Sequence, residues 1–552
     1  MDIQDTIKKE VARVLKELGV EIEEKEILLS ASDTREHGDY TTNIAFKKAK
    51  ALSLAPLALA EKIADRIRFD GLEKCEAVKP GFINFFLKSD ELGQVIKEIL
   101  DKKEHFGDVT LGKGTTINVE YVSANPTGTL HLGHARGAAL GDSISRILKK
   151  AGYNVTREYY INDAGNQIDH LGESLIARYL QLFGIDAPVP EDGYHGEEII
   201  RIAKSLKDEV GDAYVENARE HIDFFKKYGS RLLLEFIKQD LHAFRVDQDV
   251  YTSEKAIRER GAVEDVLEKL KPYCYESEGA LFLDTKKDGD DKDRVLVKSD
   301  GSYTYLLPDI AYHDDKFSRG FDRLVDLFGA DHHGYITRLK SAVKDLGHDP
   351  EKLDVCLVQM VRLFKDGEEF KMSKRTGNAI SMKELIEECG VDAVRYFFVS
   401  RSGNSHLDFD IDLAKSLGSE NPVYYAQYTH ARLCGILLNG KAFLPFEPKG
   451  DLLTSESERS LLLLLKNYPE IIASAAKELE PYKVTNYIHS LAMAINEFYT
   501  KCRVLDDKDP SLSKQRLALV DACRIVLADS LSLIGVSAPE RMVSRDKEES
   551  GL

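Results

Sequence analysis

115-TTINVEYVSAN-125 is followed, after a Pro-Thr-Gly turn, by 130-LHLGHARGAALGDSISRILKKAG-152 and then by 154-NVTREYYI-161, and these three stretches decide the fold. The first and third are rich in β-branched and aromatic residues, which predicts strands. The middle stretch has helical periodicity, a basic end and a final glycine, which predicts a helix and its stop. Strand, helix and strand at this spacing predict a parallel βαβ unit, the opening of a doubly wound nucleotide-binding domain.

Further strands are expected downstream, at 279–284, 294–300, 322–330 and 354–364. Each is a short apolar run bounded by charged or turn residues. The stretch from about 165 to 275 is mostly helical, and we expect it to be inserted into the sheet or wrapped around it. These patterns together predict an α/β domain with a parallel sheet over residues 113–420.

The two flanking regions differ from this central domain. Residues 1–112 mix helical periodicity with one strand-like run at 81–87, which is typical of a small α+β domain. From residue 421 to 552, apolar residues recur three and four apart, most clearly over 457–479 and 484–505. That spacing predicts a helical bundle, which by pattern alone could serve many functions.

The composition favours a soluble cytoplasmic protein. No apolar run approaches the roughly 20 residues that cross a bilayer, and the amphipathic start carries acids as well as lysines, unlike a secretory or transit signal. Seven dispersed cysteines without a C-x-x-C pair predict reduced thiols rather than disulfides or a zinc site. The net charge of −18 lowers the expectation of nucleic-acid binding, although it does not exclude a local basic groove.

Two histidines at the start of the predicted helix carry the first chemical signal. The spacing of His131 and His134 places both imidazoles on one face of the opening turn. Unpaired backbone N–H groups and the helix dipole favour an anion at that point. Gly133 leaves a flat surface between them for a base. In isolation the motif could be two surface histidines, but after a strand and a turn it predicts a polyphosphate cradle.

A lysine loop, 371-KMSKRTGN-378, carries the second signal. Lys371 and Lys374 supply compact, mobile cations suited to phosphate. A solvated loop is the common alternative for such a segment. Its place in the chain favours a functional role, because the histidines follow the first strand of the predicted sheet and the lysines follow the last. Both motifs are therefore expected to face the crevice at the carboxyl ends of the strands.

H-x-G-H followed much later by K-M-S-K resembles the paired signature of the class I aminoacyl-tRNA synthetases. Within that class, the chain closely resembles the arginyl-tRNA synthetase family over essentially its whole length. Arg375 stands where the class pattern has serine, so that position lacks a hydroxyl. The longer matching segments occur in the expected order, at 120–126, 160–167, 305–311, 421–428 and 539–542.

The resemblance implies a Rossmann-like (HUP-type) catalytic domain, an N-terminal domain that touches the tRNA elbow and a C-terminal anticodon-binding bundle. It implies a ligase that activates L-arginine with ATP and Mg²⁺ and then transfers it to the terminal adenosine of tRNA(Arg), releasing AMP and diphosphate. No tightly bound cofactor and no metal site are expected, and the chain is expected to be a monomer. The family also implies that activation needs bound tRNA.

The family's site residues carry over position by position. The catalytic positions are His131, His134, Lys371 and Lys374. The remaining ATP-binding positions are Gly133, Met360, Val361 and Ser373, with the backbone at Met360 and Val361 against the adenine. The arginine-binding positions are Glu120, Ser123, Asn125, Tyr305 and Asp309.

The carboxylates of the expected arginine pocket suit the ligand, because a fixed carboxylate can accept the paired donors of a guanidinium. Asp309 could instead be the N-cap of the helix that follows it, and the sequence does not separate these roles. For tRNA, the family positions are Phe82 and Asn84 in the N-terminal domain and Tyr428 and Met542 in the bundle. Phe82 could equally be an ordinary core residue.

Two other functions stay open at this stage. One is a class I synthetase for another amino acid, which the joint presence of Glu120, Asn125, Tyr305 and Asp309 disfavours. The other is a non-catalytic tRNA-binding paralogue, which the intact histidine and lysine motifs disfavour.

Overall fold

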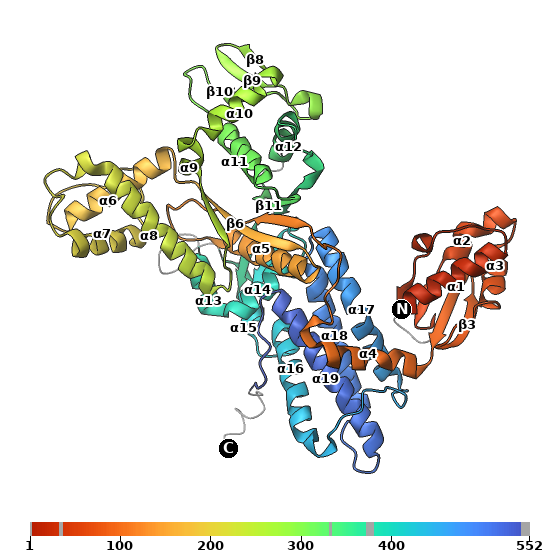
Figure 1. Ribbon diagram of the computed structural model, residues 1–552. Helices are drawn as coiled ribbons and strands as arrows, with labels where there is room; N and C mark the ends of the chain where they lie inside the picture. The colour runs from red at the N-terminus through yellow and green to blue at the C-terminus, as the bar shows by residue number, and fades with distance from the viewer. Residues whose placement is uncertain (1–2, 32–36, 331–333, 371–379, 543–552) are drawn as a thin grey trace, which may run out of the picture.

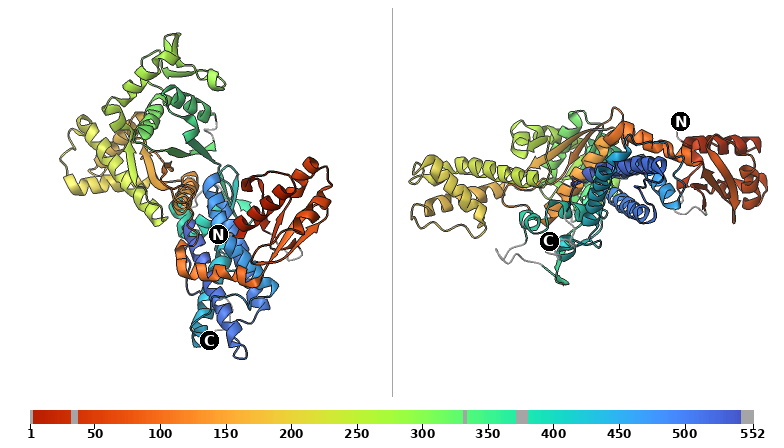
Figure 2. Two further views of the ribbon diagram at one scale, coloured as in Figure 1. Left: turned by 45° about the vertical axis from the view of Figure 1, so that its right-hand side comes forward. Right: turned by 90° about the horizontal axis from the view of Figure 1, so that it is seen from below.

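The computed structural model describes residues 3–31, 37–330, 334–370 and 380–542. Figure 1 shows a central α/β body, a helical bundle below it and an N-terminal domain that projects to one side. Seen from below, the N-terminal domain and an arm formed by α6–α8, within residues 166–243, lie at opposite ends of an elongated molecule (Figure 2).

The central sheet has five parallel strands in the order β12-β11-β5-β6-β7. The predicted βαβ unit is confirmed, with β5 at the centre of the sheet and β6 beside it. From β5 the chain builds outward to β6 and β7, and then returns to add β11 and β12 on the other side. The reversal falls between β5 and β11, so a crevice is expected at the carboxyl ends of these two strands. The bounds are β5 Thr116–Glu120, α5 Leu132–Lys150, β6 Asn154–Ile161, β7 Val250–Ser253, β11 Arg323–Gly329 and β12 Leu353–Val358.

Some predicted strands belong elsewhere. The prediction of one strand over 354–364 is wrong, because β12 ends at Val358 and a new strand, β13, begins at Val361 and pairs with β14 and β15 in another sheet. A continuous apolar run cannot reveal a break between two consecutive strands. The strands at 280–283 and 294–297 form an antiparallel sheet with β8, outside the central sheet. The bounds are β8 Cys274–Ser277, β9 Ala280–Leu283, β10 Arg294–Val297, β13 Val361–Lys365, β14 Glu368–Glu369 and β15 Leu407–Asp410.

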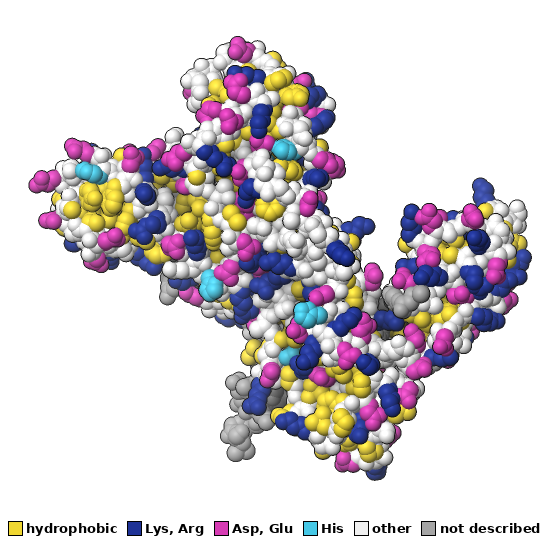
Figure 3. All heavy atoms as spheres, viewed as in Figure 1, with side chains coloured by type: hydrophobic (Ala, Val, Ile, Leu, Met, Phe, Trp, Pro, Cys, Tyr) yellow, Lys and Arg dark blue, Asp and Glu magenta, His cyan; other side chains and the backbone are white. Residues whose placement is uncertain are grey.

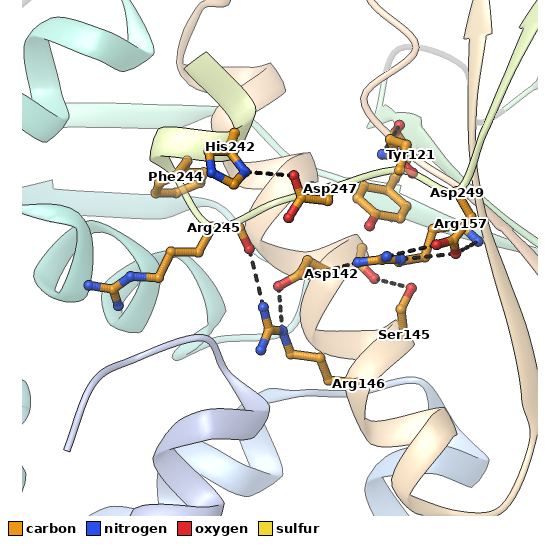
Figure 4. Close-up of polar contacts among 12 residues, drawn as sticks. Tyr121, Asp142, Ser145, Arg146, Arg157, His242, Phe244, Arg245, Asp247 and Asp249 are labelled. Carbon is orange, nitrogen blue, oxygen red and sulfur yellow. Dashed lines mark hydrogen bonds and ion pairs between the residues drawn. The ribbon is translucent and has the colours of Figure 1, made fainter. Parts of the chain in front are cut away.

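Helix α5 is fixed rigidly in the body, because nearly every residue after its first turn is buried. Its fully buried Asp142 pairs with Arg146 at 2.7 Å and with Arg395 of α14 at 2.5 Å, and Arg157 of β6 lies 3.9 Å away. Figure 4 shows Asp142, Arg146 and Arg157 around the helix. Gly141 is required for this packing, since a Cβ there would lie 2.1 Å from Cγ of Tyr121. The first turn of α5 is thereby held at a defined place above the sheet.

The other helices of the catalytic body flank this sheet or, like α6 to α8, project away from it (Figure 1). The stretch predicted as an insertion contains α6, α7 and α8, which have a hydrophobic core of their own, but its end returns to the sheet as β7. The bounds are α6 Asn166–Gln181, α7 Glu197–Val210, α8 Ile222–Ala243, α9 Glu254–Glu259, α10 Ala262–Leu270, α11 Leu306–Ser318, α12 Tyr335–Asp345, α13 Met382–Cys389, α14 Val391–Val399 and α15 Ile411–Lys415.

The flanking regions have the predicted classes. The N-terminal domain is an antiparallel sheet, β1-β2-β4-β3, with helices α1 to α3. The C-terminal region is a bundle of α16 to α19, against which α4 packs through α17 and α19. The bounds are α1 Ile3–Glu17, β1 Ser30–Ala31, β2 Tyr40–Thr42, α2 Ile44–Lys48, α3 Pro56–Ala64, β3 Leu72–Val78, β4 Phe82–Leu87, α4 Ser89–Lys102, α16 Pro422–Asn439, α17 Glu456–Glu478, α18 Tyr482–Lys501 and α19 Pro510–Leu533.

A buried ion pair joins two of these bodies. Arg459 of α17 donates to Asp39 at 2.8 Å and to the backbone carbonyl of Leu87 at 2.8 Å. Both charged side chains are about 95% buried, at 5% and 4% exposure. In the part of the chain that the structure describes, every helix is too short or too polar to cross a bilayer.

Candidate active site

His131 and His134 lie where the sequence predicted, at the start of α5, and they cap it reciprocally. The backbone N–H of Gly133 donates to Nδ1 of His131 at 3.1 Å, and the N–H of His131 donates to Nδ1 of His134 at 3.4 Å. The two rings stack with centroids 3.6 Å apart. Because each Nδ1 accepts a hydrogen bond, each ring carries its proton on Nε2. Both rings can therefore donate an N–H to a ligand beside the helix terminus.

The two rings are held uncharged. Burial lowers the pKa of His131, and burial together with the charge of His131 lowers the pKa of His134 to about 4. Two imidazolium rings stacked at this distance would repel each other. A phosphate ligand here would thus meet neutral N–H donors and the positive end of the α5 dipole.

The lysine loop itself, with Lys371, Ser373 and Lys374, lies outside the described residues, but both of its ends are fixed. On one side, the N–H of Phe370 donates to the carbonyl of Leu363 in β13 at 2.7 Å. On the other, Ser381 forms a β-bridge with His131, and the N–H of Met382 donates to the carbonyl of Leu130 at 2.8 Å. The exit of this loop is therefore hydrogen-bonded to the histidine motif.

Of the two expected adenine-facing positions, Met360 lies between β12 and β13, and Val361 is the first residue of β13. The Met360 side chain is 74% exposed, and Val361 is half-buried. Fully buried Arg136 of α5, which sequence analysis missed, donates to the carbonyl of Gln359 at 2.9 Å and to that of Ser405 at 2.7 Å. This guanidinium ties the backbone next to Met360 to the histidine helix. Its only sequence signal was an arginine on an otherwise apolar helix face.

The chain turns sharply after β5. Val122 and Ser123 adopt positive φ angles of 72° and 41°, which are strained for residues other than glycine. The turn lets the hydroxyl of Ser123 donate to Oε1 of Glu120 at 2.9 Å. Further along, the amide of Asn125 donates to Oε1 of Gln167 at 2.6 Å. Three expected arginine ligands thus gather at the carboxyl end of the central strand.

Tyr305 and Asp309 come from the start of α11, with Tyr305 directly before the helix and Asp309 in its first turn. The capping alternative for Asp309 is wrong, because α11 begins at Leu306 with Tyr305 at the N-cap position. The Tyr305 side chain is 85% exposed. Asp309 is 24% exposed and hydrogen-bonds to Tyr335, with its Oδ1 also 3.3 Å from Nδ1 of His313.

A buried charge network links the two sets of ligands. Lys316 donates to Oε2 of Glu120 and to Oδ1 of Asp326, both at 2.8 Å. His313 donates to Oδ2 of Asp326 at 2.6 Å. Glu120, His313 and Asp326 have the spacing of a metal site, with ligand atoms within 4.8 Å, but the Lys316 ammonium already bonds to two of them. The sequence signal that could have revealed His313 and Lys316 was their helical spacing from Asp309 in α11.

Burial and charge oppose each other across this network. Burial and the negative charge of Asp326 raise the pKa of Glu120, and the positive charges of Lys316 and His313 offset this only in part. Burial acts on Asp326 as well, but Lys316 and His313 together outweigh it and lower the pKa of that carboxyl. Asp326 differs from Glu120 in that it accepts hydrogen bonds from both cations, Lys316 and His313.

Comparison with known proteins identifies the family. A model of the class I (R) tRNA synthetase catalytic domain matches residues 95–398. Models of the arginyl tRNA synthetase N-terminal domain and of the DALR anticodon-binding domain match residues 3–87 and 426–542. An arginine–tRNA ligase of Shouchella clausii is 50% identical over 551 residues, which cover 98% of this chain and 99% of that protein. The chain belongs to the arginyl-tRNA synthetase family.

Other arginyl-tRNA synthetases agree. The arginine–tRNA ligase of Bacillus subtilis is 48% identical over 553 residues, covering 98% of this chain and 99% of that protein. The solved arginyl-tRNA synthetase of Thermus thermophilus superposes with a TM-score of 0.76 at 24% identity, covering 98% of this chain and all of that chain. This likeness shows a common fold.

In this member of the arginyl-tRNA synthetase family, the two expected tRNA positions of the N-terminal domain differ in exposure. Phe82 is 38% exposed and meets Phe46, also 38% exposed, edge to face at 5.4 Å, so the core alternative for Phe82 is wrong. Asn84 is buried, and its side-chain oxygen accepts a hydrogen bond from the Thr41 hydroxyl at 2.8 Å. Phe82 is therefore available to a ligand, whereas Asn84 is engaged inside the sheet.

The expected anticodon positions lie on the bundle and beyond it. Tyr428 of α16 is half-buried, stacks on Tyr424 with centroids 5.9 Å apart and lies under the Arg432 guanidinium at 4.9 Å. The same guanidinium lies 5.0 Å from the ring of Tyr499, which is exposed. Met542 is half-buried at the end of the described chain. On the face drawn in Figure 3, basic and acidic side chains are interspersed over all lobes.

Proposed function

We propose that this arginine–tRNA ligase performs both steps of its reaction in the crevice between the first turn of α5 and the start of α11. Arginine would first react with ATP to give arginyl adenylate and diphosphate. The arginyl group would then pass to the terminal adenosine of tRNA(Arg), releasing AMP. One observation carries the proposal: β5 leads at one end into the histidine motif and contributes Glu120 to the network that reaches Asp309.

In the first step, the arginine carboxylate attacks the α-phosphate in line and diphosphate leaves. Positioning and charge stabilisation do most of the catalytic work in such a transfer. On one side, the Nε2–H groups of His131 and His134 donate hydrogen bonds to phosphate oxygens. Lys371 and Lys374, with Ser373, act from the loop whose exit is bonded to Leu130. Mg²⁺ bound to ATP supplies charge neutralisation for the leaving diphosphate.

In the arginine pocket, the carboxylate of Asp309 accepts the paired donors of the guanidinium, with Tyr305 beside it at the mouth of the crevice. Glu120, oriented by Ser123, and Asn125 hold the rest of the amino acid. A site that bonds a charged fork in this way rejects analogues without it by roughly 10⁴–10⁵-fold.

For tRNA, we propose that Phe82 meets the elbow and that Tyr428 and Met542 contact anticodon-loop bases. Stacking on exposed aromatic rings is the usual way to hold single-stranded RNA. Asn84 would contribute by fixing the strand that carries Phe82, since its side chain is internally bonded. The second step would begin at the 2′-hydroxyl of the terminal adenosine, and the first step would need bound tRNA. The ligase would act as a cytoplasmic monomer.

Charging of tRNA(Arg) with radiolabelled arginine tests the proposal directly. We expect ATP-dependent charging with arginine and none with the other amino acids of class I enzymes. ATP–pyrophosphate exchange, measured with and without tRNA, should appear only when tRNA is present. Charging with a different amino acid would establish the alternative synthetase, and tRNA binding without any charging would establish the non-catalytic paralogue.

A further inference from the structure

Two cations stand behind the arginine pocket and contact its carboxylates directly. Lys316 bonds to Glu120 and Asp326 at 2.8 Å each. His313 bonds to Asp326 at 2.6 Å, and its Nδ1 lies 3.3 Å from Oδ1 of Asp309. The side chains of Lys316, His313 and Asp326 are all 0% exposed. Lys316, Asp326 and His313 therefore connect one proposed arginine ligand, Glu120, to another, Asp309, through side chains that solvent does not reach.

His313 belongs to this set as a cation for a geometric reason. Its Nε2 faces a carboxylate oxygen of Asp326, and its Nδ1 lies 2.8 Å from the backbone carbonyl of Asp309. Neither partner atom can donate, so both ring nitrogens must carry a proton. Burial and the charge of Lys316 lower the pKa of His313, but the carboxylates of Asp309 and Asp326 outweigh them and raise it to about 10.

We propose that Lys316 and His313 are positioning residues for arginine recognition: Lys316 fixes the carboxylate of Glu120, His313 fixes that of Asp309, and Asp326 anchors both. The proposal rests on the proposed arginine-binding role of Glu120 and Asp309. Three carboxylates face two cations in this network, which leaves one negative charge for an incoming guanidinium to balance. The arrangement thus matches a singly charged side chain in charge as well as in direction.

Helix geometry explains how one element does this. Asp309, His313 and Lys316 lie four and then three residues apart in α11, so their side chains share one face of the helix. That face packs toward β5 and β11, which supply Glu120 and Asp326. The neighbouring charges are internally paired, since Arg319 bonds to both oxygens of Glu158 at 2.9 Å. Buried ions that are fully hydrogen-bonded hold their partners in one geometry.

The first experiment replaces Lys316 with methionine, which keeps most of the side-chain volume. We expect the KM for arginine to rise by at least about tenfold, because Glu120 loses its buried partner. The KM for ATP should stay within about twofold, since the phosphate site is separate. His313→Gln, which removes the ring charge but keeps a side-chain donor, gives the same readout if Lys316→Met does not fold. Equal changes in the two KM values, or no change in either, would overturn the proposal.

A matched control separates positioning from general loss of a buried cation. Arg395 is also 0% exposed and pairs with an equally buried carboxylate, Asp142, away from the pocket. Arg395→Met should lower the melting temperature as Lys316→Met does, yet leave the KM for arginine within about twofold. A rise in arginine KM as large as that of Lys316→Met would assign the effect to destabilisation and overturn the positioning role.

A charge-matched double variant then separates orientation from net charge. Lys316→Met combined with Asp326→Asn removes one charge of each sign, so the network keeps its single excess negative charge. Because Glu120 still lacks its partner, we expect the arginine KM to stay raised. A return to the wild-type KM would mean that charge balance alone matters. Failure of the arginine ligase function itself would look different, because the wild-type protein would then not charge tRNA with arginine at all.

Discussion

The two halves of the crevice are built in different ways. The phosphate half comes from one continuous stretch, in which β5 leads into a turn and the first residues of α5 bond to one another. The arginine half combines Glu120 on β5 with residues of a distant part of the chain, Asp309 on α11 and Asp326 on β11. Lys316 bonds to Glu120, from which it is separated by 196 positions in the chain.

The difference shows what holds the ligand-binding groups in position in each half. A helix N-terminus attracts an anion through its own backbone, so the histidines only need to complete a local arrangement. A guanidinium needs carboxylates with fixed directions, and these depend on partners brought in by tertiary packing. Changes in the phosphate half should therefore act on turnover. Changes in the arginine half should act on substrate affinity.

The largest effect is expected from His134→Ala. Removing one donor to a charged transition state costs about 10²–10³-fold in turnover. The helix should survive, because the lost cap contact is worth only about 1 kcal/mol. Steady-state charging rates measure the effect, and His105→Ala, at an exposed histidine paired with Asp108, is the control. A wild-type rate for the His134 variant would refute the role of the histidine motif.

Asp309→Asn should affect the arginine half of the site and leave the phosphate half unchanged. Loss of a charge-assisted hydrogen bond of about 1.5–3 kcal/mol raises the arginine KM by roughly 10–100-fold, with turnover much less affected. Arginine titrations at saturating ATP give both parameters. Asp315→Asn serves as control, because this acid of the same helix pairs with Arg260 and Arg319 instead. If turnover fell and KM did not change, the division between the halves would be lost.

Arg136→Met probes the link between the phosphate half and the adenine-facing backbone. Loss of the bonds to the carbonyls of Gln359, Ser402 and Ser405 should loosen that segment. We expect the ATP KM to rise by about tenfold and the arginine KM to stay unchanged. Arg136→Lys should restore the ATP KM only in part, since an ammonium cannot span the same carbonyls. An effect on arginine instead of ATP would contradict this link.

The last prediction concerns the pH dependence of stability and leaves activity near neutral pH unchanged. The folded-state pKa of His313, about 10, lies above its ordinary value of 6.5. The stability it contributes is therefore complete below about pH 6.5 and is lost as pH rises through about 10. Between pH 7 and 9, wild type should lose stability relative to His313→Gln by about 1.4 kcal/mol per pH unit. Denaturant unfolding at several pH values measures the difference, and parallel curves would show that His313 is neutral in the folded protein.

Particular residues show which features of the fold the sequence could predict and which it could not. The βαβ unit was predictable because β5, α5 and β6 are adjacent and each has a strong period of its own. The break after Val358 was not, because the Gln359 carbonyl there bonds to Arg136, a partner more than two hundred residues earlier in the chain. Phe82 and Asn84 carry the same kind of signal, and only the sheet decides that one is exposed and the other bonded to Thr41.

By itself, the sequence determined the class of the three domains, the histidine and lysine motifs and the family. These depend on residues close together in the chain, whose spacing fixes local hydrogen bonds and helix faces. Only the tertiary structure decided that Asp309 lies past the N-cap, that the lysine loop exits against His131, and that Lys316 and His313 stand behind the carboxylates. Such contacts join distant segments, because the direction of a buried charge is set by whichever partners the fold packs against it.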